Sequence, residues 1–170
     1  MDRGFEAVIV RLADSPADST PGDVLKLVAT TLISTVGGAS GPLYGTAFLK
    51  AAIAVGTSDS LDPISLVAML TAARDGIVLR GKAESGDKTM VDAWTPAVDA
   101  AVQSQQAGGD VLAVLSAAAT AADQGAIATE PLIARKGRAS YLGERSQGHR
   151  DPGAESTRLL LQAGVDAIGG

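Results

Sequence analysis

TVGGASGPLYGTAF, residues 35–48, places four glycines within nine positions: Gly37, Gly38, Gly41 and Gly45. Such a run either lets two helices pack closely or lets backbone amides approach a phosphate group. It is not a Walker-type phosphate loop, because no G-K-[ST] follows it and no strand pattern precedes it. Taken alone, the run favours a turn between two closely packed helices, with phosphate binding as the alternative.

The composition of the chain also favours closely packed helices. Of its 170 residues 46% are hydrophobic but only 3% are aromatic, whereas strands prefer aromatic and β-branched side chains. The net charge of −5 argues against a general nucleic-acid binder, and the absence of cysteine excludes disulfides and thiolate metal sites. No segment has the pattern of a signal peptide or a membrane span. We therefore expect a cytoplasmic protein with no nucleic-acid or membrane partner.

Apolar residues recur with helical spacing along the chain, beginning with Phe5, Val8, Ile9 and Leu12 on one face. Proline beside aspartate marks helix starts, as at Asp62-Pro63. The pattern predicts helices over 5–12, 23–35, 42–55, 63–80, 90–105, 111–122 and 152–168, with a further short helix over 127–134. Residues 1–170 are thus predicted to form a single all-α domain, an antiparallel bundle or barrel of about seven helices.

The segment RKGRASYLGERSQGHR, residues 135–150, concentrates positive charge in an acidic protein. Five of the 14 cations of the chain lie here, opposed only by Glu144: Arg135, Lys136, Arg138, Arg145 and Arg150. Because a helix start follows at Asp151-Pro152, the segment suits a polyphosphate or carboxylate ligand. The alternative is a solvated basic loop that pairs with acidic neighbours.

Side chains suited to nucleophilic or metal chemistry are sparse. His149 is the only histidine; it is either a phosphoryl acceptor or an exposed neighbour of a helix start, and the second interpretation is favoured. No G-x-S-x-G motif is present, and the acidic residues do not form a metal-binding cluster. The sequence therefore predicts no catalytic residue and no metal ligand.

Three segments together closely resemble one known family. They are STVGGASGPLYGT (34–46), RGKAESGDKTMVDAW (80–94) and ARKGRASYLGERSQGHRDPGA (134–154). In order and spacing they are similar to the ADP-binding L subunits of dihydroxyacetone (glycerone) kinases, along essentially the whole chain. The resemblance implies an eight-helix barrel that holds its nucleotide at one end under covering loops.

The resemblance also implies nucleotide-binding roles for individual residues. Ala39 and Ser40 match the loop that contacts the phosphates, and Gly81 and Met90 match positions on the adenosine side. Arg138 matches an arginine that contacts the nucleotide. The loop that closes over the nucleotide is matched by Asp151, Pro152 and Gly153.

In this family ADP stays bound to the L subunit as a coenzyme and is recharged to ATP. The resemblance implies two partners: a phosphohistidine carrier (M) subunit that recharges the nucleotide from phosphoenolpyruvate, and a K subunit that holds dihydroxyacetone and receives the phosphoryl group. A transcription regulator is a further implied partner. Related kinases of the same fold use ATP directly, so the resemblance leaves the phosphate donor open.

The sequence departs from the family pattern at its start. The family motif G-D-x-D-x-G-x-N-M, whose aspartates hold Mg²⁺ at the nucleotide phosphates, would end at Met1, so its metal ligands are absent from residues 1–170. We expect that the chain lacks the first helix of the family through a mis-set start codon or a truncation. The alternative function is a regulatory or lipid-holding helical module that does not bind metal–nucleotide.

Overall fold

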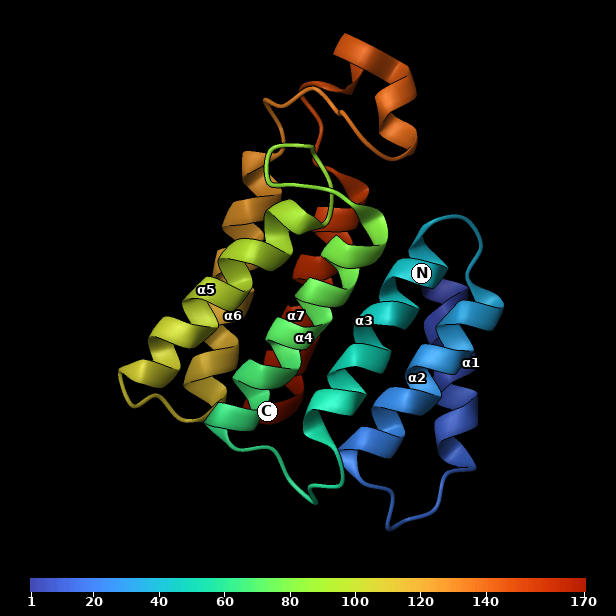
Figure 1. Cartoon of the computed structure of the whole chain (residues 1–170), viewed down its shortest axis with the longest axis vertical. Coiled ribbons are helices and arrows are strands. Elements are labelled where there is room, and N and C mark those ends of the chain that lie inside the picture. The colour runs from blue at the N-terminus through green and yellow to red at the C-terminus, as the bar shows by residue number, and fades with distance from the viewer. The chain divides into compact units, whose positions relative to one another are not determined.

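The computed structural model describes all residues, 1–170, and contains seven α-helices, one 3₁₀ helix and no strand (Figure 1). The predicted all-α fold is therefore confirmed. The chain forms two compact units, residues 1–81 and 82–170. The prediction of a single domain over 1–170 stays a prediction.

The first unit consists of four helices that pack in chain order: α1 (Asp2–Ala13), α2 (Pro21–Thr35), α3 (Ser40–Val55) and α4 (Pro63–Gly81). Local sequence sets where they begin. At α2, the Thr20 hydroxyl accepts from the Asp23 amide at 3.2 Å, and the Asp23 carboxylate accepts in return from the Thr20 amide. This capping box satisfies amides that have no partner within the helix.

The glycine stretch at residues 35–48 forms the turn between α2 and α3 and the first half of α3. A Cβ at Gly41 would overlap the carbonyl oxygen of Val36, and one at Gly45 would overlap the Ile33 side chain on α2. At Gly37, by contrast, an added Cβ would have no atom within 4 Å, and Gly38 has a positive φ of 70°. The later two glycines therefore serve close packing, while the first two form an open turn.

The second unit contains α5 (Val91–Gln106), α6 (Val111–Ala128), the 3₁₀ helix η1 (Arg138–Ser146) and α7 (Pro152–Gly169). By length and composition alone, α6 could cross a membrane. In the structure it packs against both α5 and α7, as a core helix does. Its buried residues are Val114, Leu115, Ala118, Ala119, Ala122, Gly125 and Ala126.

Two boundaries differ from the sequence prediction. The helix predicted to end at 122 continues to Ala128, and no separate helix covers 127–134. Gly125 lies within this extension of α6, where a Cβ would overlap the carbonyl oxygen of Asp92 on α5, so the position requires glycine. The polar segment after it forms η1, interrupted at Gly143, where φ is 56°.

Candidate functional site

A loop at residues 82–90 precedes α5 and is held by the Asp92 carboxylate. One oxygen of Asp92 accepts from the Gly86 amide at 2.5 Å and the other from the Thr89 amide at 2.7 Å. The loop ends at Met90, the buried N-cap residue of α5. Because both Asp92 oxygens accept backbone N–H groups, the path of the loop up to Met90 is fixed.

The segment between α6 and α7 is tied to this loop by buried polar contacts. The ammonium group of Lys88, which is only 2% exposed, donates to backbone carbonyls of that segment. The amide of Arg135 donates to the carbonyl of Asp87 at 3.0 Å. Between the end of α6 and the start of α7, the amide of Asp151 also donates to the buried Thr129 hydroxyl at 2.9 Å. The second and third segments of the family motif therefore lie together at one end of this unit.

The start of α7 is capped by its own aspartate. The Asp151 carboxylate accepts from the Ala154 amide at 2.8 Å, and the side chain is buried. Gly153 lies against α5, where a Cβ would be 3.2 Å from both the amide nitrogen and the Cβ of Met90. Because a carboxylate already occupies this helix end, the start of α7 is less suited to a phosphate than the sequence indicated.

Burial raises the pKa of Asp151 above its ordinary value, although the backbone N–H groups of Ala154 and Gly153 oppose this rise. The nearby Asp92 charge adds to the rise and Lys88 opposes it, both more weakly. A raised pKa in the folded state contributes stability below the ordinary pKa of aspartate, and this contribution is lost as the pH rises through the folded-state pKa. Ionised Asp151 therefore costs stability at neutral pH.

Replacing Asp151 by asparagine, which caps helices equally well, is expected to raise the free energy of unfolding at neutral pH. The gain should shrink as the pH falls toward about 4, the ordinary pKa of aspartate. Urea unfolding of both proteins across this range measures the difference. A variant that is less stable than the wild type by the same amount at every pH would contradict the assigned cause.

The positive charges of the cationic segment divide into two groups. Arg150 is held in an ion-pair network with Glu130 at 3.0 Å, Glu155 at 3.2 Å and Asp123 at 3.7 Å. This part of the segment thus pairs with acidic neighbours, which was the alternative to ligand binding.

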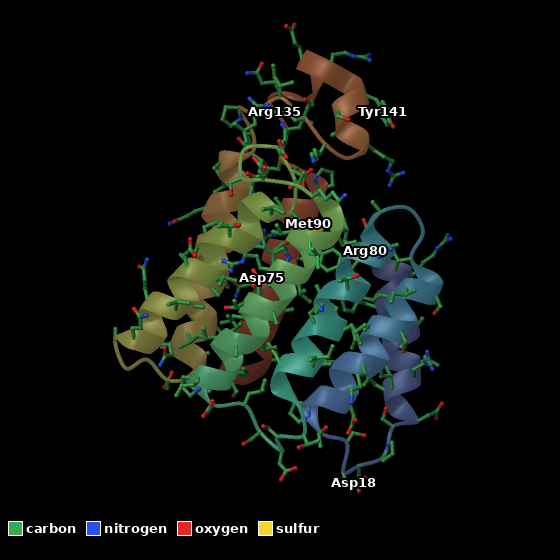
Figure 2. The ribbon with its side chains drawn as sticks, in the orientation of Figure 1. Asp18, Asp75, Arg80, Met90, Arg135 and Tyr141 are labelled. Atoms are coloured by element: carbon green, nitrogen blue, oxygen red, sulfur yellow. The ribbon has the colours of Figure 1, made fainter.

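The remaining charges lie on residues 134–146, here called the cationic loop. Arg135, Arg138 and Arg145 are exposed and make no ion pair, while Lys136 donates to the carbonyl of Lys82. Figure 2 shows Arg135 on this loop, which extends beyond the ends of α5, α6 and α7. Three exposed guanidinium groups of one loop are therefore without a carboxylate partner.

Three predicted site residues belong to the first unit. Ala39 is the exposed N-cap residue of α3 and makes no capping hydrogen bond with its side chain, and Ser40 follows it. Gly81 ends α4, and a Cβ there would lie 3.2 Å from the Leu43 side chain in the first turn of α3. The structure thus brings Gly81 beside the start of α3. In the second unit it brings Met90 beside Gly153, with Arg138 on the cationic loop.

Sequence reasoning assigned no role to Lys88, Asp92, Thr129 or Ser146, whose side chains hold the two loops of the second unit. Lys88 and Thr129 contact residues 22 to 58 positions away along the chain, so no local pattern marks them. Asp92 contacts residues only three and six positions away, and its role was missed although its partners are local. Within residues 1–170 no three carboxylate or histidine side chains form a metal-binding group. The residues present therefore do not build a Mg²⁺ site.

Comparison with known proteins identifies the family. The family model for the DAK2 domain matches residues 1–166. The ADP-binding subunit DhaL of the PEP-dependent dihydroxyacetone kinase of Escherichia coli (strain K12) is 48% identical over 162 residues, which cover 95% of this chain and 77% of that protein. Human triokinase/FMN cyclase is 31% identical over 98% of this chain but only 28% of its own length.

A solved structure shows the same fold. The match to the native dihydroxyacetone kinase of C. freundii covers 97% of this chain and 28% of the kinase chain, with a TM-score of 0.68 and 22% identity. The same kinase in complex with AMP-PNP and Mg²⁺ matches with a TM-score of 0.65. From the match over residues 1–166 and the 48% identity to the E. coli subunit, we conclude that this chain belongs to the DAK2 domain family.

Proposed function

We propose that this chain is the nucleotide-carrying subunit of a dihydroxyacetone kinase and holds ADP/ATP as a coenzyme. The observation that carries the proposal is the cationic loop, which presents three unpaired arginines before the start of α7. Two relatives that this chain covers over most of their length, one from E. coli and one from Listeria innocua, are named as ADP-binding subunits of PEP-dependent dihydroxyacetone kinases. The family match also supports treating residues 1–170 as one domain.

The arginines of the cationic loop neutralise the phosphate charge in this proposal. Arg138 makes the direct contact, and each charge-assisted hydrogen bond of this kind contributes about 1.5–3 kcal/mol. The uncapped amides at Ala39 and Ser40 contribute donors to the phosphates. Gly81 and Met90 line the adenosine side. Asp151, Pro152 and Gly153 close the loop over the nucleotide, with Asp151 acting through the shape of the helix start.

The bound nucleotide supplies a phosphoryl group that can be transferred and renewed. The chain contributes orientation and charge neutralisation rather than a base or a nucleophile. The proposed partners are a K subunit that holds dihydroxyacetone and a phosphohistidine carrier (M) subunit that recharges ADP from phosphoenolpyruvate, in the cytoplasm. A transcription regulator is proposed as a further partner.

The test is a reconstituted reaction with the cognate K and carrier subunits and the phosphoenolpyruvate phosphotransferase proteins. We expect dihydroxyacetone phosphate to form at the expense of phosphoenolpyruvate, with many product molecules for each ADP present. Omitting this chain should abolish product. Product formed with ATP but not with phosphoenolpyruvate would overturn the proposed donor, and no product with either would overturn the proposed function.

A further inference from the structure

A buried lysine lies outside the set of residues predicted to bind nucleotide. The Lys88 ammonium group donates to three backbone carbonyls: Ser146 at 2.5 Å, Leu132 at 2.9 Å and Glu130 at 3.4 Å. An ammonium group has three N–H donors, so its donor capacity is filled. Lys88 therefore has no donor left for a phosphate, and any influence on a ligand acts through the carbonyls that it holds.

The carbonyls bound by Lys88 stand at the two ends of the cationic loop. Leu132 precedes the loop, and Ser146 is its last residue. The Ser146 hydroxyl accepts from the Ala134 amide at 2.9 Å and donates to the Gly143 carbonyl at 2.6 Å. Lys88 and Ser146 therefore close the base of the loop and leave only its arginine-bearing part exposed.

The backbone at Lys88 is held in an unusual conformation. Its φ is +60°, a region that side chains other than glycine adopt at a cost. The neighbouring Asp87 carbonyl accepts from the Arg135 amide, and the neighbouring Thr89 amide donates to Asp92. The surrounding hydrogen bonds thus maintain a strained residue whose side chain connects the loop before α5 with the cationic loop.

We propose that Lys88 is a positioning residue that fixes the base of the cationic loop, so that Arg138 is oriented for the phosphates before the nucleotide arrives. The proposal rests on the proposed nucleotide-binding function. Without the Lys88 contacts, the loop samples many conformations, and nucleotide binding carries the entropic cost of ordering it. The loss should fall on the phosphates and not on adenosine, which the loop arginines do not contact.

The test combines loop proteolysis with two ligands. Lys88→Met removes the ammonium group and keeps a side chain of similar length. Because the charged hydrogen bonds at the base of the loop are lost, we expect trypsin to cleave the loop about 10-fold faster or more. The cleavage sites are those after Arg135, Lys136, Arg138 and Arg145. Affinity for ADP should fall about 10-fold while affinity for adenosine stays unchanged. The single tryptophan, Trp94, lies one turn beyond Met90, so its fluorescence is followed during titration with each ligand.

Two further variants separate positioning from general instability. Ser146→Ala removes the hydroxyl that contacts Ala134 and Gly143 at the base of the loop, and it leaves the Lys88 ammonium group in place. It should give the same effects at smaller size, even if Lys88→Met does not fold. Arg158→Gln breaks the ion pairs to Glu155 and Asp123 without touching the loop, and it should change neither loop cleavage nor the ratio of ADP to adenosine affinity.

The outcomes decide the inference separately from the proposed function. Unchanged loop cleavage in Lys88→Met, or in Ser146→Ala if Lys88→Met does not fold, would overturn the role of Lys88. Losses of affinity that are equal for ADP and adenosine would overturn it as well. If the wild type itself does not bind ADP, the proposed function and the phosphate part of this inference fail together. Cleavage of the unliganded variants still shows whether Lys88 holds the loop.

Discussion

Replacing Arg138 by methionine is expected to weaken ADP binding about 10- to 150-fold, the equivalent of the 1.5–3 kcal/mol that a charge-assisted hydrogen bond contributes. The Arg138 side chain is exposed and has no acidic partner in the chain. Its removal therefore breaks no internal ion pair and should leave the free energy of unfolding unchanged. Isothermal titration with ADP measures the loss of affinity, and thermal unfolding without ligand checks stability.

The matched control is Arg145→Met, which removes the same charge from the same loop. Both changes remove one positive charge from the cationic loop. If Arg138 makes a specific contact, Arg145→Met should therefore lose clearly less affinity for ADP than Arg138→Met. Equal losses in the two variants would mean that the loop acts as a diffuse positive patch, and the role assigned to Arg138 would be wrong.

Replacing Gly41 by alanine is expected to give the largest loss of stability. The added Cβ would overlap the backbone carbonyl oxygen of Val36 and lie 3.1 Å from that of Leu32. Backbone atoms cannot move aside as a flexible side chain can, and overpacking costs about 1–3 kcal/mol and occasionally more. This outweighs the gain of about 1 kcal/mol in helix propensity. Thermal unfolding followed by circular dichroism should show a lower Tm.

Gly37→Ala is the control from the same stretch, because no atom lies within 4 Å of the added Cβ and φ is not positive. Its effect should remain within about 0.5 kcal/mol, as for most exposed substitutions. If both variants were equally stable, the close approach of α3 to the end of α2 would not require glycine at position 41, and the assignment of Gly41 to packing would be wrong.

Local patterns in the sequence predicted most of the helices. Apolar periodicity and helix starts such as Asp62-Pro63 and Asp151-Pro152 are short-range signals, and the structure confirms the helices that they mark. The continuation of α6 to Ala128 was not predicted, and glycine is required at position 125 within it because α5 approaches closely there. A contact between helices leaves no trace in the local pattern.

The candidate site was only partly predictable for the same reason. The cationic segment and the glycine run were visible as composition, but the division between paired Arg150 and unpaired Arg138 depends on the position of Glu130. Lys88 lies 58 residues from Ser146 along the chain. Only the fold shows that its charge is directed into backbone carbonyls rather than toward a ligand.

The most direct measurement is a calorimetric titration of the wild-type chain with ADP, AMP and adenosine in the presence of Mg²⁺. If the cationic loop holds the phosphates, ADP should bind saturably to a single site, AMP more weakly and adenosine more weakly still. Absence of saturable ADP binding, or the same affinity for ADP and adenosine, would contradict a nucleotide site built on the charges of this loop.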